Sequence, residues 1–172
     1  MYGLFGKTPM EKFYYQDPYF QLIGDANRAR YVRSSSGSMC VPLTDSGMVI
    51  FIIEPSPAMG CDILTLPGGA IDPGEDRETA ANRELQEEIG YRAHQLDYLG
   101  AVRPWVKYLD AAVHLYLARH LMPSKLHGDE IYEIRTHLVP LTDFERLMVK
   151  GELMDATVIS ALFMARQFLL AT

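Results

Sequence analysis

Short apolar runs separated by turn-forming residues dominate the chain from residue 38 onward, a pattern typical of β-strands. They lie at residues 38–44, 47–54, 62–66, 94–102, 111–121 and 133–141. Asp45, Ser46 and Gly47 separate the first two runs, so a hairpin turn is expected there. Helical spacing predicts helices at residues 76–89, 141–152 and 155–171. Strands with interspersed helices predict an α/β fold, a mixed sheet with helices packed against it.

The first predicted helix has clear ends and a clear buried side. Asp76 is a candidate N-cap, and Gly90 is a candidate C-terminal stop. Ala81, Leu85 and Ile89 are four residues apart and form one apolar stripe. This helix should therefore pack against the sheet through that stripe.

Residues 1–36 differ from the rest because they are rich in aromatic and polar side chains. The stretch "RSSSGS" at 33–38 predicts a loop at their end. We expect one domain over 1–172, with 1–36 as an N-terminal extension and 37–172 as the core. The aromatic segment "KFYYQDPYF" at 12–20 is suited to packing in a strand or at an interface.

Composition narrows the possible classes of function. The formal net charge is −6, which argues against nucleic-acid partners because these need clustered Lys and Arg. The N-terminus lacks the pattern of an export signal, and no apolar run reaches the ~18 residues of a membrane span. We expect a cytoplasmic protein without a membrane partner. Cys40 and Cys61 are expected to be buried free thiols.

Three acidic residues crowd the end of the first predicted helix. Glu84, Glu87 and Glu88 are related by three and four positions, so their carboxylates share a face. Like charges at this spacing destabilise a helix, and a hard divalent cation would remove that cost. The preceding Gly68-Gly69 allows a close backbone approach that could add a carbonyl ligand. This pattern favours a site for a hard divalent cation such as Mg²⁺.

A second feature links the turn to the helix. Asp72, Pro73 and Gly74 form a predicted turn just before Glu75. Folding back of this turn would let Arg83 and Glu75 form a two-pronged ion pair. Glu75 would then hold the acidic face in place indirectly.

The full spacing resembles the signature of the Nudix hydrolase family. It runs from Gly69 through Glu75 and the segment "RELQEE" to Gly90-Tyr91. The resemblance implies a Nudix α/β/α sandwich and hydrolysis of a nucleoside diphosphate linked to another group, with Mg²⁺ or Mn²⁺. It also implies roles for individual residues, as metal ligands or as orienting groups. The implied ligands are Glu84, Glu87, Glu88 and the Gly68 carbonyl, and the implied orienting residues are Arg83 and Glu75.

The base that activates water has two candidate sources. The family uses either a glutamate of the signature, here Glu87, or a glutamate on a later loop. Glu130, in "LHGDE" just before the strand at 133–141, is the loop candidate. Both alternatives stay open from the sequence.

Within the family, the segments "AIDPGE", "LHGDE" and "VISALFMARQFL" resemble the subgroup that cleaves ADP-ribose and other ADP-linked compounds. That subgroup implies a homodimer whose N-terminal extension helps to build the nucleotide pocket. The aromatic segment at 12–20 is then also a candidate for stacking on adenine. Its members carry an arginine near the phosphates where this chain has Ile53 and Glu54. Candidate replacements are Arg33, Arg103 and Lys107.

The most direct functional hypothesis is cleavage of ADP-ribose or a related nucleotide sugar to a nucleoside monophosphate and a sugar phosphate. A second hypothesis is a pyrophosphohydrolase of damaged nucleoside triphosphates. The third belongs to another class, a Nudix-fold sensor that binds such ligands without cleaving them. The intact signature favours an enzyme over a sensor, and the N-terminal extension favours the first hypothesis over the second.

Overall fold

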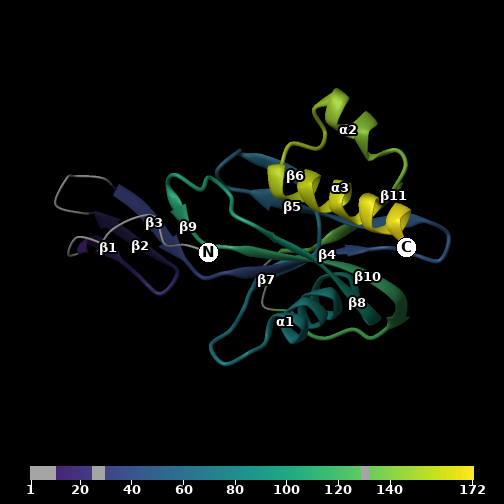
Figure 1. The fold of residues 1–172 in the computed structure, drawn as a ribbon, viewed down its shortest axis with the longest axis horizontal. Coiled ribbons are helices and arrows are strands. Elements are labelled where there is room, and N and C mark those ends of the chain that lie inside the picture. The colour runs from purple at the N-terminus through teal and green to yellow at the C-terminus, as the bar shows by residue number, and fades with distance from the viewer. Residues whose placement is uncertain (1–10, 25–29, 129–131) are drawn as a thin grey trace.

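Helices cover both faces of a layer of strands in this computed structural model (Figure 1). The structure describes residues 11–24, 30–128 and 132–172. On one face lie α1 (Arg77–Glu84) and η1 (Leu85–Ile89), which form one continuous segment. On the other face lie α2 (Phe144–Lys150) and α3 (Ala156–Ala171). This arrangement confirms the expected α/β/α sandwich.

Two sheets form the layer between the helices. The first has the order β7 (Gly68–Ala70), β4 (Gly37–Pro42), β10 (Val113–Pro123) and β8 (Tyr91–Val102). The second has the order β11 (Arg135–Pro140), β5 (Met48–Ser56) and β6 (Cys61–Thr65). Strand β4 runs parallel to β10, whereas the other neighbours in these two sheets are antiparallel. The layer is therefore mixed, as expected, and each strand predicted from residue 38 onward is present.

The turn between β4 and β5 forms without making the expected hairpin. Gly47 adopts a positive φ of 78°, and its N–H donates to the carbonyl of Thr44. The two strands then enter different sheets, because β4 pairs with β10 and β7 while β5 pairs with β11 and β6. One isolated bridge, Leu43 to Val49, is the antiparallel pairing left beside the turn. Local turn chemistry was predicted correctly, but the pairing of the strands was not.

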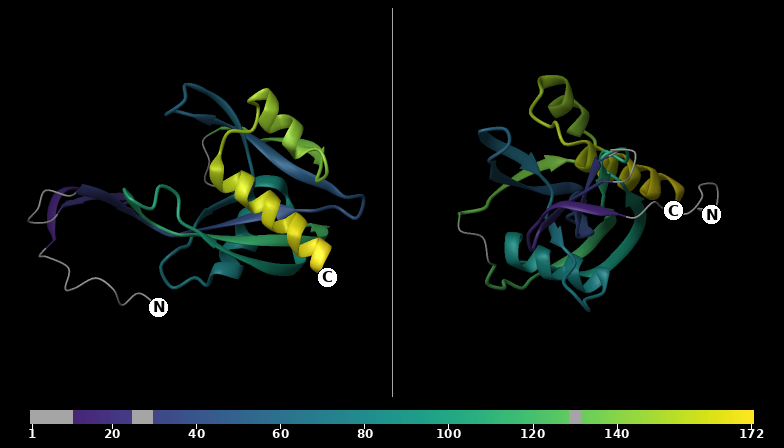
Figure 2. Two further views of the ribbon diagram at one scale, coloured as in Figure 1. Left: turned by 45° about the horizontal axis from the view of Figure 1, so that its top comes forward. Right: turned by 90° about the vertical axis from the view of Figure 1, so that its left-hand side faces the viewer.

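The N-terminal segment contains strands that the sequence pattern did not reveal. A separate sheet has the order β1 (Lys12–Gln16), β2 (Phe20–Gly24), β3 (Arg30–Ser34) and β9 (Leu109–Asp110). It projects away from the helices in both figures that show the whole fold (Figures 1 and 2). The predicted loop at 33–38 is wrong at both ends, because Ser34 ends β3 and Gly37 begins β4. Strand β1 is exposed throughout, so no apolar alternation marks it.

Each face of the layer has its own apolar core. Leu117, Phe51 and Leu162 belong to the cluster beneath α3, and each is buried. The predicted stripe of Ala81, Leu85 and Ile89 is buried in the cluster beneath α1 and η1. Burying a leucine side chain contributes about 1.5–3 kcal/mol, so the stripe fixes how the acidic segment lies on the sheet.

The two cysteines differ in their exposure to solvent. Both are free thiols, but only Cys40 is buried, whereas Cys61 is exposed at the start of β6. The expectation of two buried thiols is therefore wrong for Cys61, because β6 lies at the edge of its sheet. In the part of the chain that the structure describes, no helix has the length and apolar character needed to span a membrane.

Candidate functional site

Side-chain and backbone caps define the helix that carries the acidic residues. The Asp76 carboxylate accepts hydrogen bonds from the N–H groups of Glu78 and Thr79, both at 3.0 Å. At the other end Gly90 adopts a left-handed conformation with φ 76°, and its N–H donates to the carbonyl of Leu85. Both predicted ends are confirmed. Five-residue spacing of that last bond makes the segment Leu85–Ile89 a π-turn, a feature often found at functional sites.

Two of the three acidic side chains are packed against strand β7. Glu84 and Glu88 are each only 6% exposed. The N–H of Gly68 donates to the Glu88 carboxylate at 2.9 Å. A Cβ at position 69 would lie 2.4 Å from a Glu84 oxygen, so only glycine fits beside that carboxylate. The Gly68-Gly69 pair thus brings backbone close to both buried acids, whereas the Gly68 carbonyl as a metal ligand stays a prediction.

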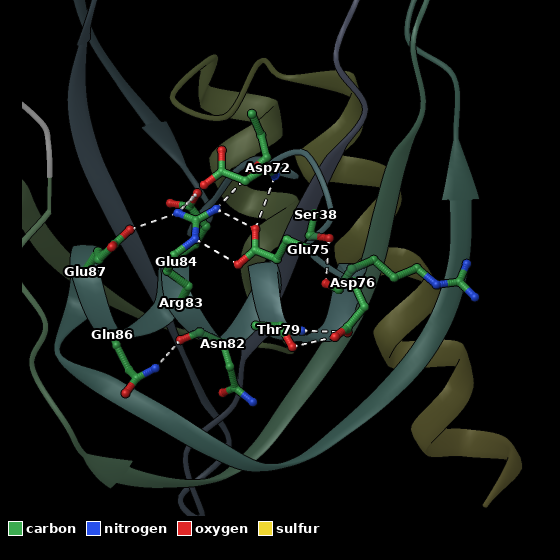
Figure 3. Close-up of polar contacts among 12 residues, drawn as sticks. Ser38, Asp72, Glu75, Asp76, Thr79, Asn82, Arg83, Glu84, Gln86 and Glu87 are labelled. Carbon is green, nitrogen blue, oxygen red and sulfur yellow. Dashed lines mark hydrogen bonds and ion pairs between the residues drawn. The ribbon is translucent and has the colours of Figure 1, made fainter.

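Arg83 lies at the centre of the acidic cluster (Figure 3). Its Nε and Nη2 donate to the two carboxylate oxygens of Glu75 at 3.1 and 3.2 Å. Its Nη1 donates to Glu84 at 2.7 Å and to Glu87 at 3.0 Å. Nη2 also donates to the carbonyl of Ala70 at 2.9 Å. The turn, strand β7 and the helix are therefore held together by one guanidinium group.

Electrostatics at the site follow from these contacts. Hydrogen bonds from Arg83 lower the pKa of the Glu75 carboxyl, although partial burial opposes that shift. The same bond to Glu75 raises the pKa of Arg83, with further contributions from Glu84 and Glu87. Burial raises the pKa of the Cys40 thiol, and the nearby Glu88 and Glu84 carboxylates raise it further. Cys40 is thus a neutral thiol beneath the acidic helix.

The donor set suits a hard divalent cation. Glu84 and Glu88 are buried anions, and Glu87 is only 16% exposed. Carboxylate and carbonyl oxygens are preferred by Mg²⁺ and Mn²⁺. Within residues 11–24, 30–128 and 132–172, no three acidic, histidine or cysteine side chains converge in a ready metal-binding group. Arg83 bridges Glu84 and Glu87 in this arrangement, and it supplies the positive charge between them.

An open pocket of about 530 Å³ lies beside the acidic residues. Glu87 and Glu88 form one side, and the connection between β10 and β11 forms the other. That connection contributes Lys125 and Tyr132, which sequence reasoning missed. The Tyr132 hydroxyl donates to Glu54 at 3.1 Å. Neither residue has a distinctive sequence context. Their place at the site arises only because the fold brings this connection to the end of the helix.

Glu130 lies outside the described residues. Gly128 and Tyr132, on either side of it in the sequence, both line the pocket. Its role as the base therefore stays a prediction.

The three candidate substrate-binding cations are not among the residues that line this pocket. Arg33 pairs with Glu11 at 2.8 Å and with Asp110 at 3.1 Å. Arg103 lies 3.5 Å from the same Asp110. Lys107 stands over the ring of the neighbouring Tyr108, with its Nζ 5.3 Å from the ring centroid. The structure thus groups Arg33 and Arg103 at the N-terminal sheet, and their role in binding substrate stays a prediction.

Comparison with known proteins gives a consistent result. The model of the NUDIX domain matches residues 36–159. ADP compounds hydrolase NudE of Escherichia coli strain K12 is 33% identical over 131 residues, which cover 76% of this chain and 70% of that protein. ADP-ribose pyrophosphatase of Bacillus subtilis strain 168 is 30% identical over 135 residues, which cover 77% and 73%. A crystal structure of an ADP compounds hydrolase superposes with a TM-score of 0.80 at 28% identity, covering 96% of each chain.

Proposed function

This chain belongs to the NUDIX family, and we propose that it hydrolyses the diphosphate bond of ADP-ribose or a closely related ADP-linked compound. It is a hydrolase that acts on diphosphate bonds. The proposed substrate class is supported by two relatives, an ADP compounds hydrolase and an ADP-ribose pyrophosphatase. With ADP-ribose, cleavage of the bridge gives AMP and ribose 5-phosphate, because one phosphate stays on each half.

The observation that carries this proposal is the pair of buried carboxylates, Glu84 and Glu88, set against the backbone of Gly68 and Gly69. Arg83 supplies one positive charge to Glu84 and Glu87, whereas three carboxylates crowd this end of the helix, so further positive charge is favourable there. A pocket lined by carboxylates would also repel a diphosphate. A divalent cation shared by the protein and the substrate would offset both the charge of the crowded carboxylates and their repulsion of the diphosphate.

We propose that Glu84, Glu87 and Glu88 hold Mg²⁺ or Mn²⁺, with the Gly68 carbonyl as a further ligand. When bound, such a cation offsets the charge of the diphosphate and makes a water molecule more acidic. Arg83 and Glu75 orient the carboxylates, since the ion pair between them fixes the turn against the helix. The pocket beside Glu87 and Glu88 is the proposed position of the diphosphate.

Either Glu130 or Glu87 takes the proton from the attacking water in this proposal. A position between Gly128 and Tyr132 supports Glu130, because both neighbours line the pocket. The position of Glu87 at the pocket wall supports the alternative, although Arg83 already holds its carboxylate. Substitution of Glu130 distinguishes the two, as described in the Discussion.

The N-terminal sheet is proposed to join two copies of the chain. Phe13, Tyr15, Tyr19 and Phe20 are all more than half exposed on its strands and turn. Aromatic residues are enriched at interfaces. If the sheet of one copy reaches the pocket of the other, its cations approach the substrate. We propose that Arg33, Arg103 and Lys107 bind substrate in this way.

The test is a product analysis of the purified protein with ADP-ribose, ADP-sugars, dinucleotides and nucleoside triphosphates, each with Mg²⁺ and with a chelator. We expect AMP and ribose 5-phosphate from ADP-ribose, with no product when the chelator is present. Preferential cleavage of a triphosphate would replace the proposed substrate with a nucleoside triphosphate. Tight binding of ADP-ribose without cleavage of any compound would identify a sensor.

A further inference from the structure

The end of the acidic helix is held by the first residues after strand β10. The N–H of Ser124 donates to the carbonyl of Gly90 at 2.8 Å. The N–H of Leu126 donates to the carbonyl of Gln86 at 3.1 Å. The Ser124 hydroxyl also donates to the side-chain oxygen of Gln86 at 2.8 Å. We call Ser124–Leu126 the helix clamp, because it occupies carbonyls that a helix end leaves unpaired.

Lys125 adds the contact that reaches the acidic cluster. Its Nζ donates to the main-chain carbonyl of Glu87, which lies inside the π-turn. The aliphatic part of the side chain covers Gly90, since a Cβ on Gly90 would lie 3.4 Å from the Cδ of Lys125. An ammonium group at the C-terminal end of a helix also interacts favourably with the helix dipole. Lys125 therefore contacts both the turn that carries the acids and the glycine that ends it.

The bond from Lys125 is made to the π-turn, and this turn sets the directions of Glu87 and Glu88. Glu87 and Glu88 are adjacent, yet Glu87 faces Arg83 whereas Glu88 faces Gly68. The backbone of Leu85–Ile89 sets both directions, and its last carbonyls depend on partners outside the helix. A change in this turn would move both carboxylates together.

We propose that Lys125 is a positioning residue, whose bond to the Glu87 carbonyl holds the π-turn in the shape that presents Glu87 and Glu88 to a divalent cation. This inference rests on the proposed function in one respect, namely that the carboxylates bind the cation. No contact of Lys125 with substrate is required.

A simpler role for Lys125 makes the opposite prediction. Lys125 lines the same pocket as Glu87 and Glu88. If it acted only as a nearby positive charge, it would repel a cation, and its removal would tighten metal binding. If it positions the turn, its removal weakens metal binding. The direction of the change therefore separates the two roles.

The experiment is a calorimetric titration of the whole protein with Mn²⁺ alone, without nucleotide. The variants are Lys125→Met, which keeps the aliphatic stem, and Lys125→Arg, which keeps a charged donor. Lys150→Met is the control, because Lys150 is exposed in α2 and its nearest ionic partner is Glu152 at 3.8 Å. Residues that support metal ligands typically change affinity by about 10- to 100-fold when substituted.

We expect Lys125→Met to bind Mn²⁺ about tenfold more weakly, Lys125→Arg to stay within about threefold of the wild type, and Lys150→Met to be unchanged. Unchanged or tighter binding by Lys125→Met would overturn the proposal. An equal loss in Lys125→Arg would also overturn it, because the donor to the carbonyl would then be irrelevant.

A second, milder variant keeps the proposal testable if Lys125→Met does not fold. Ser124→Ala removes only the hydroxyl bond to Gln86. We expect about twofold to threefold weaker Mn²⁺ binding, with an unchanged circular dichroism spectrum. Unchanged Mn²⁺ binding in this variant, together with misfolding of Lys125→Met, would count against the clamp. A wild type that binds Mn²⁺ but cleaves no diphosphate would refute the proposed function while leaving these titrations valid.

Discussion

Arg83 and Glu75 form a two-pronged ion pair that ties the end of the Asp72–Gly74 turn to the acidic helix, with nitrogen–oxygen distances of 3.1 and 3.2 Å (Figure 3). Both side chains are shielded from solvent, at 25% and 12% exposure. Only arginine offers two parallel donors in one plane, so the geometry is specific for it. The remaining guanidinium contacts reach Glu84 and Glu87.

Replacing Arg83 with lysine should therefore reduce kcat by about 10- to 100-fold, because a single ammonium group cannot hold Glu75 and both other acids. Arg166→Lys is the matched control, since Arg166 makes a similar two-pronged pair with Glu145 on α2. Steady-state kinetics with ADP-ribose, together with circular dichroism, measure the effect. Equal activity of the two variants would contradict a special role for Arg83.

Glu84→Gln or Glu88→Gln should lower kcat by at least ~100-fold, because each removes a ligand charge from the proposed metal site. The fold should survive, since glutamine has nearly the same shape. Glu78→Gln is the control, because Glu78 lies exposed in the first turn of the same helix. Full activity in a chelator, or an active Glu88→Gln variant, would exclude the metal site.

If Glu130 is the base, Glu130→Gln should strongly lower kcat with little effect on Mn²⁺ and substrate binding, because the base acts mainly in the transition state. If Glu87 is the base, the same Glu130→Gln substitution should lower kcat by less than ~10-fold, equivalent to about 1.4 kcal/mol. Single-turnover kinetics and calorimetry on this variant decide between them. An unchanged chemical step would remove Glu130 from the mechanism.

Light scattering should give twice the chain mass of 19.4 kDa at micromolar concentration, if the N-terminal sheet joins two copies. The double variant Tyr19→Ser and Phe20→Ser should weaken this dimer by at least about tenfold, because interface aromatics often dominate binding energy. Val149→Ser removes a 90% exposed apolar residue on α2 and serves as the control. A monomer mass for the wild type would refute the interface.

The stability of the protein should depend on pH through His114. Burial lowers the pKa of His114 below the ordinary 6.5, and the charges of Arg77 and Arg103 lower it further. Its Nδ1 lies 3.4 Å from Arg77 and 3.1 Å from the Tyr98 hydroxyl. As the pH falls through 6.5, the unfolded chain binds a proton at His114 more readily than the folded chain does.

The free energy of unfolding should therefore be highest above pH 6.5 and should decrease as the pH falls through 6.5 toward the lowered pKa of folded His114, with part of the slope due to this residue. His114→Asn should flatten that slope. Denaturant titrations of both proteins across this range provide the measurement. Identical slopes would show that His114 does not contribute.

Local chemistry in the sequence determined the acidic helix and its ends. Asp76 caps the helix by accepting from N–H groups two and three residues later in the sequence. Gly90 ends the helix because glycine readily adopts positive φ. The Arg83–Glu75 pair was equally predictable, since its partners are only eight residues apart and the turn before Glu75 folds back onto the helix. The spacing of Ala81, Leu85 and Ile89 decided which face is buried.

Tertiary structure decided which distant segments meet. Turn residues after β4 do not reveal that it pairs with β10, because that pairing depends on competition among all the strands. The exposed strands of the N-terminal sheet carry no apolar alternation, so periodicity missed them. Lys125 lies 38 residues from Glu87 in the sequence, and nothing near it predicts a bond to that carbonyl. Contacts within a few residues follow from backbone geometry, whereas such long-range contacts exist only once the whole core has packed.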